Sequence, residues 1–270
     1  MRWLARLFAA LFGSKTPPVP AVASCALGVC THRNSEGEIA GVQALGVGHA
    51  RVTIYTLQSG DLASWAWKMP QYDAAGLSLL IVVHDPINSD DMVTAMAALT
   101  RKYQGRTWQV GNEADADPAH YAGTGKKYAA LMRRVIAACP VGTQFAGMAL
   151  ATTWKDDDGR WTAFLKDYLA AGGPTLAAWC GNAYRDVVAQ AAVLHRALNG
   201  RMPVWITEFG TEHGDDAQIA LLATVPTFAK GGVSRAYWYC YWDAQDEGFG
   251  LVRYDDAHRP AWERVRTIYH

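Results

Sequence analysis

Short β-rich runs alternate with longer helical patterns from residue 25 to the end of the chain. The strand candidates are Cys25–Thr31, His49–Tyr55, Leu77–His84, Thr107–Gly111, Gln144–Leu150, Leu176–Cys180, Val204–Thr207 and Ser234–Tyr239. The helical stretches between them include Ser89–Tyr103, Tyr121–Ala138, Trp161–Ala171, Val187–Leu198 and Ala217–Lys230. This alternation is typical of β-α-β units, which place their strands parallel in one sheet.

The number of these units predicts how the sheet closes. Eight strand candidates in a chain of 270 residues favour a single (β/α)8 TIM barrel with short loops, because that fold usually takes about 250 residues. A doubly wound open sheet is the alternative, but no glycine-rich phosphate-binding loop follows the first predicted strand. We therefore expect residues 25–270 to form one barrel domain, with functional side chains at the carboxyl ends of its strands.

The first 24 residues have the character of a leader. Arg2 and Arg6 flank Trp3 and Leu4, and the short apolar run Leu7–Phe12 comes next. A proline-rich spacer and the small residues Ala21–Ser24 follow it. The run is too short to span a bilayer as a helix, but it resembles a signal-peptide core with a cleavage region. We expect export to the periplasm or the cell exterior. An uncleaved amphipathic leader and acylation of Cys25 are the alternatives.

Composition restricts the classes of partner and of site. The 25 basic and 25 acidic residues cancel, so no global field attracts nucleic acid or an anionic membrane. The five cysteines form no CxxC pair, which favours buried free thiols over a zinc site, with one bridge such as Cys25–Cys30 as the alternative. The 11 tryptophans and 12 tyrosines suit either core filling or stacking on ligands such as sugar rings.

Two glutamates follow directly from apolar predicted strands. Glu113 comes after Trp108-Gln109-Val110-Gly111-Asn112, and Glu208 comes after Val204-Trp205-Ile206-Thr207. By strand count they terminate the fourth and seventh strands, so both side chains are expected in the mouth of the barrel. A buried glutamate needs a partner, so a structural ion pair at each strand end is the alternative to a catalytic pair.

Together with this ordered pair, the chain resembles clan A of the glycoside hydrolases from about Ala26 onward, and families 39 and 5 most of all. The resemblance extends to Gly28-Val29, to Leu45-Gly46-Val47 leading into Arg51, to Asn182-Ala183-Tyr184, and to Tyr237-Trp238-Tyr239 with Gly248–Leu251. It implies retaining hydrolysis of glycosidic bonds, with Glu113 as general acid/base and Glu208 as nucleophile. This chemistry needs a protonated acid and a carboxylate about 5 to 5.5 Å apart, and it uses no metal and no cofactor.

The resemblance also implies roles for the residues around the pair. Arg51 and Tyr184 would hydrogen bond to Glu208, Asn112 would bind the sugar 2-hydroxyl, and Trp238 would form the platform under the sugar. Many members of the family carry His-x-Tyr where this chain has Asn182-Ala183-Tyr184. The contact that such a histidine makes with a sugar hydroxyl or with the acid/base is therefore in doubt here.

Further side chains at the predicted strand ends are candidates for the cleft. His32 and His84 would contact sugar hydroxyls, and otherwise bond to neighbouring backbone groups. Aromatic residues in the loops either flank the cleft or pack beneath those loops, and they are Trp154, Trp65, Trp67 and Trp242. Glu212 and His213 either line a subsite or belong to an exposed loop.

The sequence therefore predicts a monomeric retaining glycosidase whose partner is a polysaccharide or oligosaccharide, not nucleic acid. Short loops predict a shallow open groove, which favours endo-cleavage of a polymer, and we favour a bacterial exopolysaccharide. Plant-type β-glycans remain an alternative substrate, and a non-catalytic carbohydrate-binding barrel remains an alternative function. A metal-dependent hydrolase would need several histidine and aspartate ligands at strand ends, whereas the first strand offers only His32.

Overall fold

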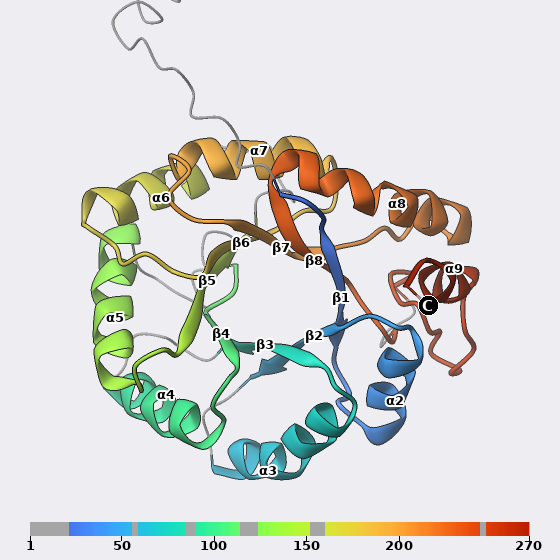
Figure 1. The fold of residues 1–270 in the computed structure, drawn as a ribbon, viewed down its shortest axis with the longest axis horizontal. Coiled ribbons are helices and arrows are strands. Elements are labelled where there is room, and N and C mark those ends of the chain that lie inside the picture. The colour runs from blue at the N-terminus through green and yellow to red at the C-terminus, as the bar shows by residue number, and fades with distance from the viewer. Residues whose placement is uncertain are drawn as a thin grey trace, which may run out of the picture.

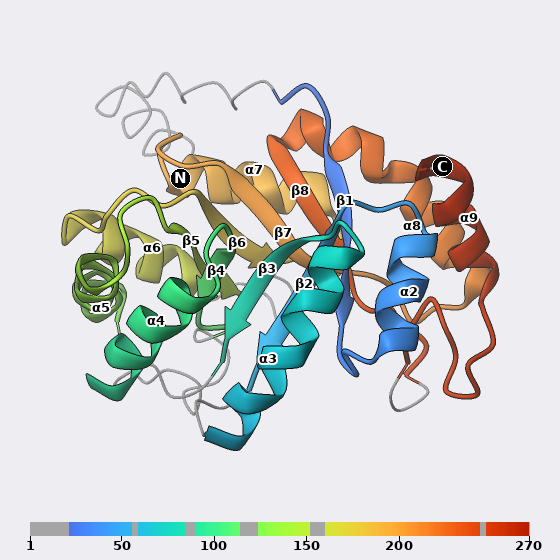
Figure 2. The same ribbon diagram turned by 60° about the horizontal axis from the view of Figure 1, so that its bottom comes forward.

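The computed structural model describes residues 22–55, 59–84, 90–113, 124–151, 160–243 and 247–269. Eight parallel strands close into a barrel in the order β1-β2-β3-β4-β5-β6-β7-β8, and the helices surround it (Figures 1 and 2). The predicted (β/α)8 TIM barrel is confirmed. Most of the predicted leader, residues 1–21, lies outside the described residues.

Each strand except β8 is followed by a helix that returns the chain to the start of the next strand, and α9 closes the chain after β8. The strands are β1 Ala26–Thr31, β2 His49–Ile54, β3 Ser78–Val83, β4 Thr107–Val110, β5 Gln144–Leu150, β6 Ala178–Asn182, β7 Val204–Phe209 and β8 Val233–Trp238. The helices are α2 Glu36–Ala44, α3 Ser59–Ala74, α4 Asp90–Lys102, α5 Gly125–Ala138, α6 Arg160–Ala170, α7 Val187–Ala197, α8 Asp215–Phe228 and α9 Pro260–Tyr269, with a 3-10 turn η1 at Ala229–Gly231.

Two strands differ from their predicted bounds in a way that affects the site. Strand β6 begins at Ala178, which pairs with Ala146, and it extends to Asn182. Strand β8 ends at Trp238, one residue before the predicted end. Pairing with the neighbouring strands sets these bounds, and local β-propensity does not contain that information.

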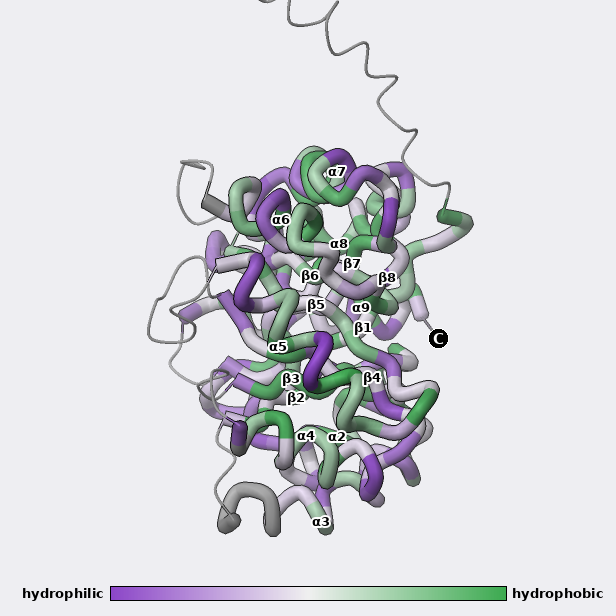
Figure 3. Tube along the Cα trace, turned by 90° about the vertical axis from the view of Figure 1, so that its left-hand side faces the viewer, coloured by the Kyte–Doolittle hydropathy of each residue, from purple (hydrophilic) through white to green (hydrophobic). Residues whose placement is uncertain are grey.

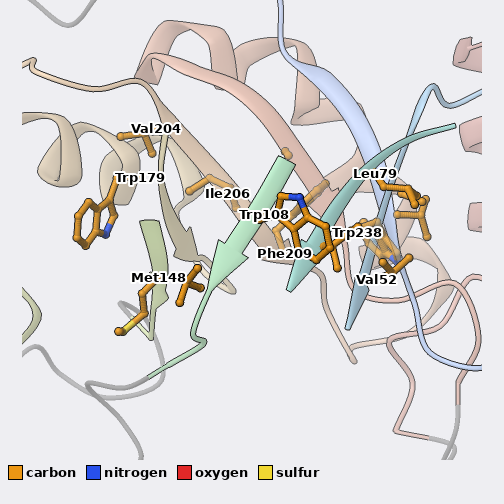
Figure 4. Packing of buried hydrophobic residues seen from close by; sticks show 14 of the residues in the cluster. Val52, Leu79, Trp108, Met148, Trp179, Val204, Ile206, Phe209 and Trp238 are labelled. Carbon is orange, nitrogen blue, oxygen red and sulfur yellow. The ribbon is translucent and has the colours of Figure 1, made fainter. Parts of the chain in front are cut away.

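Apolar side chains on the outer face of the strands pack against the helices. This shell includes Val52, Leu79, Trp108, Met148, Trp179, Ile206, Phe209 and Trp238 (Figure 4). Apolar stretches coloured green in Figure 3 run along the central strands, and purple polar stretches alternate with green on the surrounding helices. Strands buried on both faces are expected to be apolar throughout, as β3 with its sequence SLLIVV is.

The inner face of the barrel carries a second, smaller cluster. It contains Cys30, Leu80, Ala146, Ala149, Ala178, Cys180, Trp205, Tyr237 and Cys240. The ring of Tyr237 lies so close to Gly28 that a Cβ at that glycine would come within 2.6 Å of it. All five cysteines are free and buried, which confirms that they serve as small apolar side chains and that Cys25 and Cys30 form no bridge.

Helix starts and strand ends are fixed by specific polar contacts. The side chains of Ser35, Thr124 and Asp186 accept hydrogen bonds from backbone N–H groups in the first turns of α2, α5 and α7. Tyr128 of α5 donates to the carbonyl of Val110 at 2.8 Å and accepts from the N–H of Met148 at 2.9 Å, which ties the helix to β4 and β5. In the described ranges, no helix is both long and apolar enough to cross a membrane.

Candidate active site

Glu208 reaches the barrel interior through an irregularity in β7. Ile206 and Phe209 both belong to the outer apolar shell although they are three residues apart, and the pairing register shifts between them. Strict alternation would place only one inward-facing side chain in this interval, but here both Thr207 and Glu208 contact inward-facing groups of other strands. A β-bulge redirects side chains in this way, and bulges are common next to active sites.

The carboxylate of Glu208 is held by one cation and one phenol. Arg51 donates from Nη1 to Oε1 at 2.8 Å, and Tyr184 donates from Oη to Oε2 at 2.6 Å. Burial alone would lower the pKa of Arg51, but the charge of Glu208 raises it above its ordinary value. Burial and the charge of Glu208 raise the pKa of Tyr184 well above its ordinary value. Both groups therefore stay protonated as donors, as predicted.

Arg51 also connects this carboxylate to the end of β4. Its Nη2 donates to Oδ1 of Asn112 at 2.8 Å, and its Nε donates to Oε1 of Gln109 at 3.4 Å. Gln109 in turn donates to the carbonyl of Gly111 at 2.9 Å. The guanidinium thus fixes the position of Asn112, which is partly buried and immediately precedes Glu113.

Glu113 stands on backbone that turns sharply out of β4. Gly111 has a φ of 91° and Glu113 a φ of 48°, and the N–H of Glu113 donates to the carbonyl of Ala149 at 2.7 Å. The glycine adopts its conformation without a steric penalty, whereas a glutamate in the left-handed region is uncommon. Strain of this kind is often concentrated at functional sites.

A neutral amide holds the side chain of Glu113. Asn182 donates from Nδ2 to Oε1 of Glu113 at 2.7 Å, and its Oδ1 accepts a hydrogen bond from Thr207 at 2.9 Å. Asn182 is fully buried, at the last position of β6. The contact to the predicted acid/base, which the Asn-Ala-Tyr sequence had put in doubt, is therefore made by an amide.

The predicted sugar platform is wrong by one residue. Trp238 is completely buried on the outer face of β8, its ring lies 5.3 Å from that of Phe209, and its indole N–H donates to the carbonyl of Phe249 at 3.0 Å. Side chains alternate along a strand, so an inward Tyr237 places Trp238 outward. The partly buried Tyr239 is instead the aromatic ring beside the cluster, 6.1 Å from the ring of Tyr184.

His32 lies next to this tyrosine. Its ring stands edge-on to Tyr239 with centroids 5.2 Å apart, and its backbone N–H donates to the buried carboxylate of Glu38 at 3.2 Å. Burial lowers the pKa of the His32 imidazole, with Glu208 opposing and Arg51 reinforcing the shift. The imidazole is therefore neutral near pH 7, and it belongs to the Glu208 side of the site.

His84 follows β3, and its ring lies 5.9 Å from that of Tyr55, which is 54% exposed after β2. Burial raises the pKa of Tyr55, with Arg51 and Glu208 making smaller electrostatic contributions. These two rings extend the candidate site beyond the ends of β2 and β3. Trp154 lies outside the described residues, so its predicted place in the cleft stays a prediction.

A depression of about 260 Å³ adjoins the Glu208 side of the site. It is lined by Tyr184, Arg185, Gly210, Thr211, Glu212, His213 and Phe249. Tyr184 links it to the polar cluster around Glu208 because its hydroxyl bonds to that carboxylate. Glu212 and His213 are both exposed loop residues and lining residues of this depression, so the two interpretations of them are compatible.

The tryptophans predicted to flank the cleft divide by environment. Trp65 is buried in the outer shell, which confirms packing for this residue. Trp67 is 48% exposed on α3, a helix rather than the predicted loop. Trp242 is partly buried, with the guanidinium of Arg33 only 3.0 Å from its ring centroid and Tyr254 stacked at 5.6 Å.

No group of three or more metal-ligating side chains comes together in the part of the chain that the structure describes.

Sequence reasoning missed Thr207, Gln109 and Tyr239. Thr207 and Gln109 lie within predicted strands, and their inward direction depends on the alternation and the bulge. The one available signal was the polarity of these two side chains in otherwise apolar strands. The run Tyr237-Trp238-Tyr239 is aromatic throughout and so contains no signal for the face of each ring.

Comparison with protein-family models and with curated proteins found no match. Solved structures match nearly the whole chain. A GH5_18 variant from Bifidobacterium longum subsp. longum in complex with Manβ1-4GlcNAc has a TM-score of 0.69 at 12% identity, covering 91% of this chain and 78% of that one. Two GH128 subgroup II endo-β-1,3-glucanases, from Pseudomonas viridiflava and Sorangium cellulosum, have TM-scores of 0.64 and 0.65 at 17% identity, covering 90% of this chain and 98% of theirs.

These comparisons establish the fold. The chain is similar in structure to glycoside hydrolase barrels of the GH5 and GH128 families, which agrees with the clan-level resemblance in its sequence. At this identity the likeness does not transfer activity or substrate. The chemistry therefore has to be argued from the residues of the site.

Proposed function

We propose that the protein is a retaining glycoside hydrolase in which Glu208 is the nucleophile and Glu113 the general acid/base. The observation that carries this proposal is the Glu208 carboxylate, 8% exposed, bonded to Arg51 and Tyr184. Arg51 links this carboxylate to Asn112 after β4, and Asn182 bonds to Glu113 in the same cluster. A structural ion pair would need only Arg51 and Glu208. It gives no reason to place a second carboxylate, on a left-handed backbone, in the same cluster.

The proposed reaction has two displacements. Glu208 attacks the anomeric carbon while Glu113 gives its proton to the glycosidic oxygen, so the bond between carbon and leaving oxygen breaks as the ester to Glu208 forms. Glu113 then takes a proton from water, whose oxygen attacks the same carbon and releases Glu208. The enzyme returns to its starting protonation state, and the anomeric configuration is retained.

The contacts of Glu208 suit both halves of this cycle. In the resting site, the cation and the phenol both donate hydrogen bonds to the carboxylate and fix its orientation. When the ester breaks, negative charge returns to Oε1 and Oε2, where Arg51 and Tyr184 already lie at 2.8 and 2.6 Å. Preorganised donors of this kind need no rearrangement as charge develops.

For the substrate we propose an endo-cleaved polysaccharide, with a bacterial exopolysaccharide favoured and plant-type β-glycans as the alternative. The depression beside Tyr184 supports binding of more than one sugar unit, because it gives room beyond the proposed catalytic pair. The rings of Tyr184 and Phe249, packed edge-on with centroids 5.6 Å apart, form part of its lining. Its remaining lining is polar, as hydroxyl groups require. The structural neighbours that act on or bind β-linked sugars suggest β-1,3-glucan and β-mannan as the first polymers to test.

The direct test is reducing-end release from a panel containing these polymers, xylan, other β-glucans and bacterial exopolysaccharides. Wild-type protein is compared with Glu113→Gln and Glu208→Gln, and with Glu263→Gln as a control at an exposed glutamate of α9. We expect activity in the wild type and the control only, and proton NMR of the fresh product should show a retained anomer. Binding without cleavage would favour a carbohydrate-binding barrel, and an inverted product would reject the nucleophile.

Two further measurements test the finer parts of the proposal. A fall in polymer viscosity that precedes most of the reducing-end release indicates endo-cleavage, whereas early release of monosaccharide contradicts it.

A polymer substrate is too large to enter a cell, so we also propose export through the leader-like residues 1–24. Mass spectrometry of the chain recovered outside the cytoplasm should show its removal, and an intact chain retained in the cytoplasm would reject export.

A further inference from the structure

Asn182 and Thr207 form a buried polar chain that ends on the Glu113 carboxyl group, and Thr207 immediately precedes Glu208 in the sequence. Both side chains are fully buried, and they face each other across β6 and β7. Thr207 donates from Oγ1 to Oδ1 of Asn182 at 2.9 Å, and Asn182 donates from Nδ2 to Oε1 of Glu113 at 2.7 Å. Buried polar groups have few alternative partners, so each of these bonds constrains the next.

The hydroxyl of Thr207 determines which end of the amide faces Glu113. An asparagine side chain can rotate by half a turn and exchange its donor and acceptor ends. A hydroxyl proton directed at Oδ1 favours the orientation in which Nδ2 faces Glu113. The other acceptor within reach of this hydroxyl is the carbonyl of Gly181, at the longer distance of 3.5 Å.

The amide in turn determines which oxygen of Glu113 is protonated. An amide N–H only donates, so the oxygen that faces it has to accept, and the carbonyl oxygen of a protonated carboxyl group accepts better than its hydroxyl oxygen does. Oε1 is therefore the acceptor, and the proton resides on Oε2. Because the amide does not titrate, this arrangement holds at every working pH.

We propose that Thr207 and Asn182 are a positioning pair for the acid/base: Thr207 orients the amide, and the amide holds Oε1 of Glu113 so that the transferable proton lies on Oε2. The inference rests on the proposed role of Glu113. Among the described residues, the cluster also brings together Arg51, which bonds to Asn112, Glu208 with its partner Tyr184, and the buried thiol of Cys30 beside Arg51 and the carbonyl of Thr207. Their contributions have to be separated from that of the amide.

The test is an NMR titration of the Glu113 carboxyl carbon in 13C-glutamate-labelled protein, with the signal assigned by Glu113→Gln. A donor to a carboxylate favours the ionised form, so Asn182→Ala should move the titration midpoint of Glu113 up by about one pH unit. Thr207→Val should move it in the same direction by less, and Thr207→Ser should restore the wild-type midpoint. Thr227→Val on the exposed face of α8 is the matched control, and the Glu208 signal monitors indirect effects.

Kinetics provide the second readout. The basic limb of the profile of kcat/KM against pH reports the acid of the free enzyme, so it should follow the NMR midpoint from variant to variant. We expect kcat to fall about tenfold in Asn182→Ala with KM nearly unchanged, because the amide acts through Glu113. Unmoved midpoints in both Asn182→Ala and Thr207→Val would overturn the inference.

The two proposals fail separately. If no substrate is found and the Glu113 midpoint still moves as expected, the effect of the pair on Glu113 stands, and its role in catalysis falls with the glycosidase proposal. If the wild type cleaves a polysaccharide and the midpoint does not move, the reverse holds. If Asn182→Ala does not fold, the opposite outcomes of Thr207→Val and Thr207→Ser decide the question, because both retain the amide.

Discussion

Glu208 and Glu113 belong to one polar cluster, but the two sides of that cluster are built differently. On the Glu208 side, the carboxylate is almost fully buried and bonds to a guanidinium and to a phenol. On the Glu113 side, the carboxyl group is partly buried and accepts a hydrogen bond from a neutral amide. A full positive charge favours the anion far more strongly than an amide dipole does. The two carboxyl groups can therefore perform different tasks in the same cleft.

The largest loss of activity is expected when the Glu208 carboxylate is replaced by a neutral amide. Glu208→Gln removes the nucleophile and should reduce kcat/KM on the order of 10⁵- to 10⁶-fold, as loss of a covalent nucleophile does elsewhere. The measurement is initial rates with the best substrate of the panel, beside Glu263→Gln. More than a hundredth of wild-type activity in Glu208→Gln would contradict the assignment.

The neutral side should respond differently to the same chemical change. Glu113→Gln is expected to lose about 10²- to 10⁴-fold in kcat with natural leaving groups, because proton donation contributes that much. With an aryl glycoside whose phenol leaves readily, bond cleavage needs little protonation, so the loss at the first displacement should shrink. Glu208→Gln should lose as much activity on the aryl glycoside as on the natural substrate. Equal losses on both substrates would mean that Glu113 is not the acid.

Stability separates the two sides as well. Arg51→Met leaves the buried charge of Glu208 unpaired and should lower the free energy of unfolding by about 3 to 5 kcal/mol. Asn182→Ala removes a neutral partner and should cost about 1 to 3 kcal/mol. Urea unfolding measures both. Arg266→Met, which breaks an exposed pair with Glu263, should cost under about 1 kcal/mol, and a similarly small cost for Arg51→Met would show that the buried pair is not maintained.

A smaller effect is expected from the phenol. Tyr184→Phe keeps the ring and removes the donor to Oε2 of Glu208, so kcat/KM should fall about 10- to 100-fold with little loss of stability. Introduced into Glu208→Gln, the same change should have almost no further effect, because the group it serves is already absent. Additive losses in the double variant would place Tyr184 in a separate role.

The smallest expected effect uses His32 as a reporter of charge. Burial lowers the pKa of His32 while the charge of Glu208 raises it, so Glu208→Gln should lower that pKa further. Arg51→Met should raise it, and Glu113→Gln should leave it nearly unchanged. NMR titration of the imidazole measures these shifts. An equal shift in both glutamate variants would show that the two sides are not electrostatically distinct.

The lowered pKa of His32 also has a consequence for stability. The folded chain binds this proton less readily than the unfolded chain does, so the contribution of His32 to stability is complete above the ordinary histidine value of about 6.5. That contribution decreases as pH falls below this value toward the pKa of the folded state. Unfolding by urea at a series of pH values should show a flatter acid limb in His32→Asn.

The barrel and its two glutamates could be predicted because they depend on sequence order and period. Eight β-rich runs identify the strands, and a strand-end glutamate is recognisable without coordinates, as the confirmed bounds of β5 and the position of Glu208 illustrate. The inward direction of Glu208 beside an inward-facing Thr207 depends on a bulge that only strand pairing reveals. For a related reason, the sequence could not predict which of Trp238 and Tyr239 points into the barrel. Three consecutive aromatic residues contain no alternation of polar and apolar side chains.

The left-handed backbone at Glu113 lowers the stability of the fold at a residue that the proposed reaction requires. A glutamate at a φ of 48° costs about 1 to 2 kcal/mol relative to glycine, which takes this conformation freely. A chain selected only for heat resistance would tend to replace residue 113, and it would become a more stable barrel without the proposed acid/base. Residue 113 should therefore be excluded from any stabilising library, and its mutational tolerance when selection for activity is lifted would show how strongly function retains it.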